Sequence, residues 1–208
     1  MRLIVITPEQ KISGETDIVN SLFHEGMEWL HVRKPDLDRQ DLRRYIEAID
    51  QRFHDRIVIH GYFELCIEYG LGGIHFNSRM RASADFAKNA MLATANKIST
   101  SFHSWDEIAD NEFGYGCVFI SPVFDSISKA GYGAGIDLAG AREIKRKLSA
   151  QKKYCPEIIG LGGVGAGQIR MLHEYGFDGA AALGGVWLAT DPVAAFSAIN
   201  AQVKLLRR

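Results

Sequence analysis

Two clusters of glycine stand where consecutive short apolar runs end in the last third of the chain. Gly160-Leu161-Gly162-Gly163 closes one run, and Leu183-Gly184-Gly185 closes the next. Glycine has no Cβ, so backbone N–H groups in such loops can approach an anion closely. Tight turns also use glycine, but two clusters in succession favour a phosphate site. The residues predicted to form it are Gly162, Gly163, Leu183 and Gly184.

A loop rich in hydroxyl groups follows another apolar run. It begins with Ser121 and continues to Ser126, Ser128 and Lys129 before three closely spaced glycines. Hydroxyls beside a lysine can contact an anion. An ordinary solvated loop has the same composition, so the residues alone leave both interpretations open.

Basic side chains occur in or near the ends of other apolar runs. Arg33 suits bidentate binding of a phosphate or a carboxylate, and pairing with a carboxylate inside the fold is an equal alternative. A histidine in a strand is most often a hydrogen-bonded core residue, so a catalytic role would require several to cluster at one site. The candidates, with the serine that accompanies them, are His31, His60, His75, Ser101 and His103.

Carboxylates are scarce near the ends of these runs. Asp125 is the only carboxylate in a loop predicted to lie near the strand ends. A Mg²⁺ site that binds pyrophosphate usually has one or two carboxylates. The sequence therefore predicts neither a metal site nor a resident cofactor. His24, His54 and His173 fall in helical patterns or beside them and are expected at the surface.

The elements that position these residues follow a regular alternation. Eight short apolar runs predict parallel strands covered on both faces, at residues 3–7, 29–34, 56–61, 73–77, 97–102, 117–121, 157–161 and 179–183. Amphipathic patterns between them predict helices at 17–24, 39–52, 63–69, 82–88, 105–111, 138–150, 167–175 and 192–206. This order predicts a closed α/β barrel of the (β/α)8 TIM type in one domain, residues 1–208, with an open doubly wound sheet as the alternative.

Composition limits the classes of function. The 208 residues carry a net charge of −1, and 47% are hydrophobic, which argues against a disordered chain and against a basic nucleic-acid binder. No run of about 18 apolar residues predicts a membrane span. The three cysteines are far apart and no signal peptide is indicated, so a cytoplasmic protein without disulfides is expected. The expected partner is a small phosphorylated molecule, and the oligomeric state, including a homo-oligomer, stays open.

Several motifs, taken in order, resemble the thiamin phosphate synthase/TenI family. They are Ser99-Thr100-Ser101-Phe102-His103-Ser104, Ser121-Pro122-Val123-Phe124 with Ser126-x-Ser128-Lys129, Gly162-Gly163, and Gly176-Phe177-Asp178-Gly179. The match extends over most of the chain to Asp191-Pro192 and is weaker in the first half. The motifs are specific as a set, although no single one is.

The resemblance implies a TIM barrel that binds thiazole phosphate or thiamin phosphate at its mouth, the end where the strands terminate. It implies a phosphate cradle at Gly162, Gly163, Leu183 and Gly184, and a contacting loop at Ser126, Ser128 and Lys129. It also matches Arg33, Ser101 and His103 to motif residues of the second and fifth strands.

Departures from the family pattern bear on the reaction. Synthases of this family hold Mg²⁺ with an Asn-Asp pair after the third strand and an aspartate after the fourth, and the matching residues here are His60, Gly61 and Met80. TenI-type members, which are similar to thiazole tautomerases, also lack these aspartates, and their second strand begins as His31-Val32-Arg33 does.

The proton-transferring histidine of the TenI-type members corresponds to Ser121, so His31, His60 or His103 would have to replace it. We therefore expect a TenI-like, metal-independent tautomerase. The alternatives are a thiamin phosphate synthase that joins a pyrimidine diphosphate to thiazole phosphate and uses Mg²⁺, and a non-catalytic phosphate-binding or regulatory protein. An unrelated phosphate-binding barrel isomerase is a further alternative.

Overall fold

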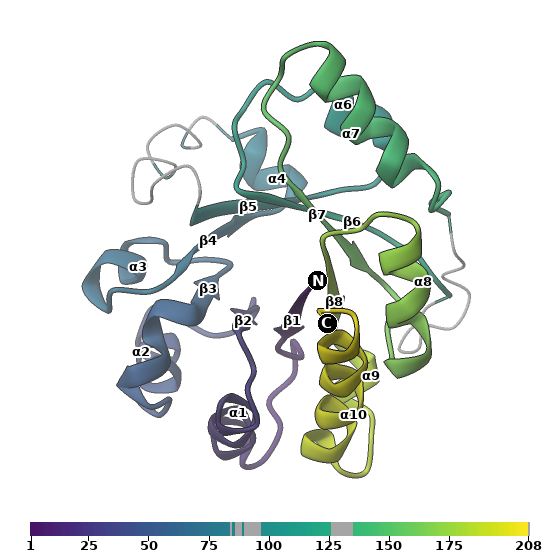
Figure 1. The fold of residues 1–208 in the computed structure, drawn as a ribbon. Coiled ribbons are helices and arrows are strands. Elements are labelled where there is room, and N and C mark those ends of the chain that lie inside the picture. Colours follow the sequence, from purple (N-terminus) through teal and green to yellow (C-terminus); the bar gives the residue numbers. More distant parts are fainter. Residues whose placement is uncertain (84, 86–88, 90–96, 126–134, 208) are drawn as a thin grey trace.

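The computed structural model describes residues 1–83, 85, 89, 97–125 and 135–207. In these ranges the strands form a closed barrel, in which each strand pairs in parallel with the next and β8 pairs with β1 (Figure 1). The prediction of a (β/α)8 TIM barrel is confirmed. The strands are β1 (Arg2–Ile6), β2 (Trp29–Val32), β3 (Ile57–Ile59), β4 (Gly73–Phe76), β5 (Ile98–Phe102), β6 (Cys117–Ile120), β7 (Glu157–Leu161) and β8 (Gly179–Ala182).

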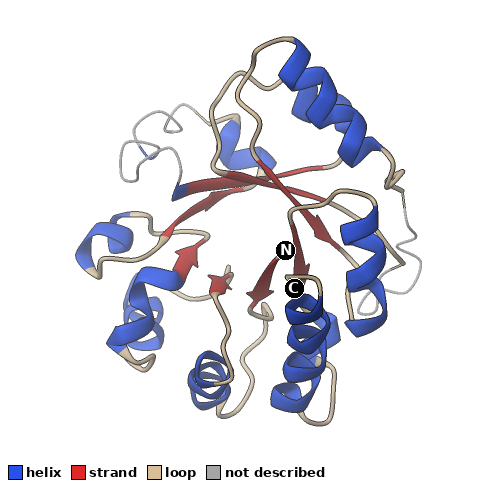
Figure 2. Ribbon diagram, in the orientation of Figure 1, coloured by secondary structure: helices blue, strands red, loops and turns tan. Residues whose placement is uncertain are grey.

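Helices lie outside the ring of strands (Figure 2). They are α1 (Glu15–His24), α2 (Arg39–Glu47), η1 (Gln51–Arg56), α3 (Glu64–Glu68), α4 (Ser78–Arg81), α6 (Trp105–Ala109), α7 (Gly140–Ala150), η3 (Ala166–Gln168), α8 (Ile169–Glu174), α9 (Gly184–Trp187) and α10 (Pro192–Leu205). Among them, no described helix has the length and apolar composition that crossing a bilayer requires.

Side-chain caps fix the starts of several helices. Asp38 accepts a hydrogen bond from the backbone N–H of Asp41 at 2.8 Å, and this cap begins α2. Ser104 and Asp191 cap α6 and α10 in the same way. Each cap satisfies one of the N–H groups that the first turn of a helix leaves without a partner.

One predicted helix is divided in the structure, and one short helix was not predicted. The single helix predicted over 39–52 is wrong, because α2 ends at Glu47 and the carboxylate of Asp50 caps a separate 3-10 helix, η1. A short helix that was not predicted, α4, starts at Ser78, where the Asn77 side chain accepts from the backbone N–H of Met80 at 2.9 Å, and it ends at Arg81, before the helix predicted over 82–88. Residues 84 and 86–88 of that prediction lie outside the described residues.

The interior of the barrel is apolar on one side and polar on the other. Alternate residues of each strand point inward, and those of β1, β6, β7 and β8 form an apolar cluster of Ile4, Ile6, Cys117, Phe119, Ile159 and Ala181. On the other side, β2, β4 and β5 direct histidine and serine side chains inward, against Phe119 and one another. The prediction of strands apolar on both faces is therefore wrong for these three.

His54 is buried, so its predicted place at the surface is wrong. Its Nε2–H donates to the carbonyl oxygens of Ile46 and Ile49, at 3.2 and 3.0 Å, at the end of α2. The side chain satisfies carbonyl groups that the helix end leaves without partners. His24 and His173 are exposed, as predicted.

Candidate functional site

A cavity of about 530 Å³ opens where the strands end, at the mouth of the barrel. This is the face at which TIM-barrel enzymes place their active sites. A second hollow, about 760 Å³, lies among Asn20, Glu47 and Tyr69, where helices α1, α2 and α3 end or nearly end, so it is on the opposite face. The mouth cavity brings together seven of the candidate residues: Arg33, His60, His75, Ser101, His103, Ser121 and Leu183.

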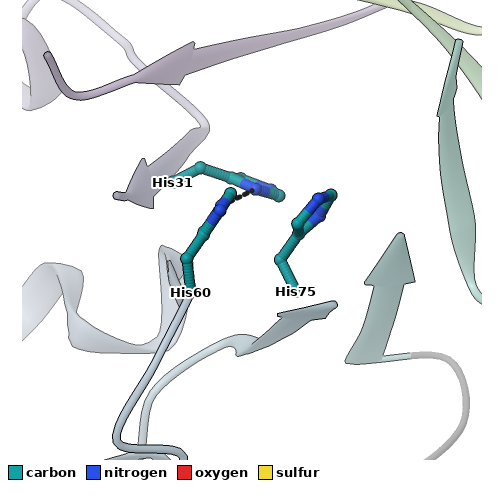
Figure 3. Close-up of side chains that lie close together, drawn as sticks. All are labelled: His31, His60 and His75. Atoms are coloured by element: carbon teal, nitrogen blue, oxygen red, sulfur yellow. Dashed lines mark hydrogen bonds between the residues drawn. The ribbon is translucent and has the colours of Figure 1, made fainter. Parts of the chain in front are cut away.

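Three histidines from consecutive strands meet at the floor of this cavity (Figure 3). His31 lies on β2 and is buried, His60 directly follows β3, and His75 lies on β4. His31 Nδ1 lies 3.0 Å from His60 Nε2, and the rings of His60 and His75 stack with centroids 4.2 Å apart. The structure therefore brings together three of the candidate histidines, as a catalytic role would require.

The imidazoles of the cluster are neutral at neutral pH. Burial, with a smaller effect from the positive charges of Arg33 and Arg81, lowers the pKa of His75 to about 3. Burial and the neighbouring imidazoles also hold the pKa values of His31 and His60 well below the usual histidine value. Each ring therefore keeps one nitrogen lone pair that can accept a proton or bind a ligand.

We expect stability to fall on acidification, in part because of these buried rings. The unfolded chain binds a proton at His75 below about pH 6.5, whereas the folded chain does so only near pH 3, so stability is full above pH 6.5 and is lost as the pH falls. Between about pH 5.5 and 4, His75→Gln should reduce the slope of unfolding free energy against pH by about 1.4 kcal/mol per unit. Urea unfolding at several pH values measures this, and an unchanged slope would contradict it.

His103 and Ser121 form a second pair at the cavity wall. His103 is exposed, and its Nδ1–H donates to the backbone carbonyl of Ser121 at 3.1 Å, with the Ser121 hydroxyl 3.5 Å away. This bond leaves Nε2 as the acceptor of the ring. The pair comes from the ends of β5 and β6, so a ligand in the cavity would have histidines on two walls.

Arg33 lies at the rim of the cavity and forms an ion pair with Glu9. Both side chains are about two-fifths exposed, 42% and 44%, so the pair is at the mouth and not inside the barrel. The backbone of Arg33 is held by Thr7, whose hydroxyl accepts from its N–H at 2.9 Å. Sequence reasoning missed Glu9 as a mouth carboxylate, although its position three residues beyond β1 places it in a strand-end loop.

Lys34 borders the same cavity but is held by a buried ion pair. Its Nζ lies 2.7 Å from Glu15 Oε2 and donates to the carbonyl of Gln10 at 3.0 Å. The other carboxylate oxygen of Glu15 accepts from the hydroxyl of Tyr45 at 2.7 Å. This network connects α1 and α2 to the end of β2, so Lys34 stabilises the rim of the cavity.

The glycine loops after β7 and β8 pack closely against neighbouring backbone. Gly163 has a positive φ of 63°, and a Cβ there would lie 2.3 Å from the carbonyl oxygen of Asp125. A Cβ at Gly185 would lie 2.2 Å from the carbonyl oxygen of Val164. The loops after β6, β7 and β8 therefore contact one another through positions that only glycine fits.

A short helix, α9, follows β8 and was missed by sequence reasoning. It begins at Gly184, one residue after the cavity-lining Leu183, and its glycines give no helical pattern. The first N–H groups of a helix have no partner within it, and a short extra helix after β8 is a recurrent part of phosphate sites in TIM barrels. Ser126, Ser128 and Lys129, the predicted loop residues, lie outside the described residues.

The fold and the mouth cavity together define the class: this is a TIM-barrel protein whose cavity at the carboxyl ends of the strands is lined by histidine, serine and arginine side chains among apolar ones. A family model described as thiamine monophosphate synthase matches residues 3–186, and the chain belongs to this thiamine monophosphate synthase/TenI family.

Individual relatives agree with this assignment. A thiamine-phosphate synthase of Desulfitobacterium hafniense (strain DSM 10664 / DCB-2) is 25% identical over 200 residues, which cover 92% of each chain. The crystal structure of thiamine phosphate pyrophosphorylase from Bacteroides thetaiotaomicron is similar with a TM-score of 0.77 and 28% identity, covering 99% of this chain and 98% of that one. Thiamine phosphate pyrophosphorylase from Pyrococcus furiosus shares the fold, with a TM-score of 0.76, 16% identity and coverage of 99% and 96%.

Proposed function

We propose that this chain binds a phosphorylated thiamin precursor, thiazole phosphate or thiamin phosphate, in the mouth cavity. The observation that carries the proposal is the arrangement of the cavity rim. Arg33 follows β2 and Leu183 follows β8, the two strands that flank β1, and Leu183 lies beside the glycine loops after β7 and β8. A guanidinium and backbone N–H groups both bind phosphate, and the cavity volume of about 530 Å³ is that of a small-molecule site.

The reaction that the relatives support is thiamin phosphate formation. In that reaction the thiazole nitrogen forms a bond to the pyrimidine methylene carbon, and the carbon–oxygen bond to pyrophosphate breaks. The departing pyrophosphate carries away the electron pair, so cations near it lower the barrier. Arg33 is a cation of the described cavity wall that can serve this purpose.

The described residues do not fit the Mg²⁺ ion that such a reaction commonly uses. Mg²⁺ requires oxygen ligands, chiefly carboxylates and substrate phosphates. Glu9 is the only carboxylate among the described residues that line the cavity, and it is paired with Arg33. Gly61 and Met80, which line the cavity where the family pattern has aspartates, offer no carboxylate.

Thiazole tautomerisation is the second candidate, and the side chains of the cavity favour it. It requires a proton to be removed from one ring position and returned to another, and an imidazole side chain can both accept and donate a proton. His60 and His103 line the cavity from different strands, so that one could remove a proton and the other could return one. Neither residue needs a metal ion for this purpose.

Calorimetric titration and two turnover assays test the proposal. We expect thiazole phosphate and thiamin phosphate to bind with the same stoichiometry, and the thiazole alcohol without phosphate to bind much more weakly. Turnover with a pyrimidine diphosphate would assign the synthase reaction, and loss of the tautomeric proton signal by NMR would assign the tautomerase. Binding without either turnover would identify a non-catalytic binding protein, and no binding of either phosphate ester would refute the proposal.

Arg33→Met is expected to weaken thiazole phosphate binding about 10- to 100-fold, because a hydrogen bond between charged groups contributes roughly 1.5–3 kcal/mol. Affinity for the thiazole alcohol should be nearly unchanged, since the guanidinium contacts only the phosphate. Glu9→Gln is the matched control: it releases Arg33 from its ion pair and should retain or improve phosphate affinity. Equal loss for both ligands would remove Arg33 from the phosphate site.

A further inference from the structure

The histidine cluster at the cavity floor has the donor atoms of a metal site. One ring nitrogen from each of His31, His60 and His75 lies within 4.8 Å of the other two. His31 Nδ1 and His60 Nε2 are already 3.0 Å apart, and nitrogens around one zinc-type ion lie roughly 3.3 Å from each other. Because the His60 and His75 rings are stacked with their planes 17° apart, one of the two rings must turn for all three lone pairs to converge on a single ion (Figure 3).

Hydrogen bonds are compatible with the metal-binding tautomer of His75. When the Ser99 hydroxyl donates its hydrogen to the carbonyl of Ile74, 3.3 Å away, it can accept from His75 Nδ1–H at 2.9 Å. His75 Nε2 then carries the lone pair, and it accepts from the Ser101 hydroxyl at 2.9 Å. Ser101 can rotate away, whereas Ser99 would remain as the outer partner that fixes a metal-binding histidine.

The bond between His31 and His60 holds a single hydrogen. Two neutral imidazoles 3.0 Å apart share one N–H, with the lone pair of the second ring directed at it. A metal ion that displaces this proton would receive a lone pair from each nitrogen. The hydrogen would leave this nitrogen and the other nitrogen of the same ring would take one up, so the ring stays neutral and no oxidant or reductant is needed.

The surroundings of the cluster favour a transition metal with an open coordination position. His31 is buried below, while His60 and His75 line the mouth cavity, so an ion would face the cavity. No carboxylate belongs to the cluster in the described part of the chain. Imidazole suits Zn²⁺ and similar ions, whereas Mg²⁺ and Ca²⁺ select oxygen.

We propose that His31, His60 and His75 bind one divalent transition metal ion of the zinc type, with its remaining position directed into the mouth cavity. This departs from the absence of a metal site predicted from the sequence. It does not depend on the proposed function, because the ligands, their spacing and their tautomers are properties of the cluster itself. The ion would place a positive charge in the cavity where the family pattern has carboxylates.

Metal titration of the full chain, after dialysis against a chelator, tests the site. Co²⁺ should bind at about one equivalent and produce the visible absorption of a four-coordinate ion with nitrogen ligands, and Zn²⁺ should displace it. An excess of Mg²⁺ should not displace Co²⁺. Absent Co²⁺ bands, or displacement by Mg²⁺ as readily as by Zn²⁺, would overturn the proposal.

Single-residue variants distinguish metal binding by the cluster from metal binding by other histidines. His60→Asn, at the half-buried edge, should abolish the Co²⁺ bands, and Ser99→Ala should weaken Zn²⁺ binding about 10- to 100-fold through the loss of an outer partner. His103→Asn is the matched control, a mouth histidine outside the cluster, and should leave the bands intact. Circular dichroism checks that each variant is folded. Retention of the bands by folded His60→Asn, or their loss in folded His103→Asn, would refute this assignment.

Discussion

Glu15→Ala is expected to lower the free energy of unfolding by about 3–5 kcal/mol, because it leaves a buried charge without its partner. The side chains of Lys34 and Glu15 are 1% and 5% exposed, with Nζ and Oε2 2.7 Å apart. Tyr45 would also lose the carboxylate that accepts its hydroxyl hydrogen bond. Burial and this carboxylate raise the pKa of Tyr45, so the phenol stays protonated in the network.

Urea unfolding of Glu15→Ala measures this loss, with Asp17→Ala as control. Asp17 lies in the same first turn of α1 but is exposed, so its loss should cost less than about 1 kcal/mol. Replacing both Glu15 and Lys34 by methionine should recover part of the stability, because no charge is then buried. A Glu15→Ala protein as stable as Asp17→Ala would contradict the account of this pair.

Gly163→Val is expected to reduce thiazole phosphate affinity by more than about 100-fold, the value that a loss of roughly 3 kcal/mol gives. The new Cβ would lie 2.3 Å from the Asp125 carbonyl oxygen and 2.7 Å from the Phe124 Cβ, so the loops after β6 and β7 must separate. The positive φ of 63° adds about 1–3 kcal/mol of backbone strain in any residue but glycine.

Gly167→Ala is the matched control for this substitution. It lies in the next few residues of the same connection, and no atom lies within 4 Å of its added Cβ. Calorimetry should show thiazole phosphate affinity close to wild type for Gly167→Ala and none measurable for Gly163→Val. Circular dichroism establishes whether the barrel of the valine variant is intact. An intact barrel with unchanged affinity would remove Gly163 from the site.

The barrel could be predicted from the sequence because its signals are local. Short apolar runs alternate with amphipathic ones, and capping residues such as Asp38, Ser104 and Asp191 define helix starts. Where local signals compete, the prediction fails. Asp50 offers a second cap within a continuous helical pattern, and α9 consists of residues with little helical preference, so tertiary packing decides both.

The site was only partly predictable, because its contacts cross between strands. The mouth residues Arg33, Ser101 and His103 follow from strand ends, whereas the cluster around His31 depends on the register that sets His75 beside Ser99. That register is fixed by the closure of the barrel, and the sequence of a single strand does not predict it. The same holds for Glu9, whose partner is 24 residues away.

A crystal structure of the protein with bound thiamin phosphate tests the central claim most directly. The account predicts the phosphate in the mouth cavity, with its oxygens accepting hydrogen bonds from the backbone N–H groups of Gly163 and Gly184 and from the guanidinium of Arg33. A phosphate bound anywhere outside this cavity, or bound in it without contact to either glycine loop, would contradict the account.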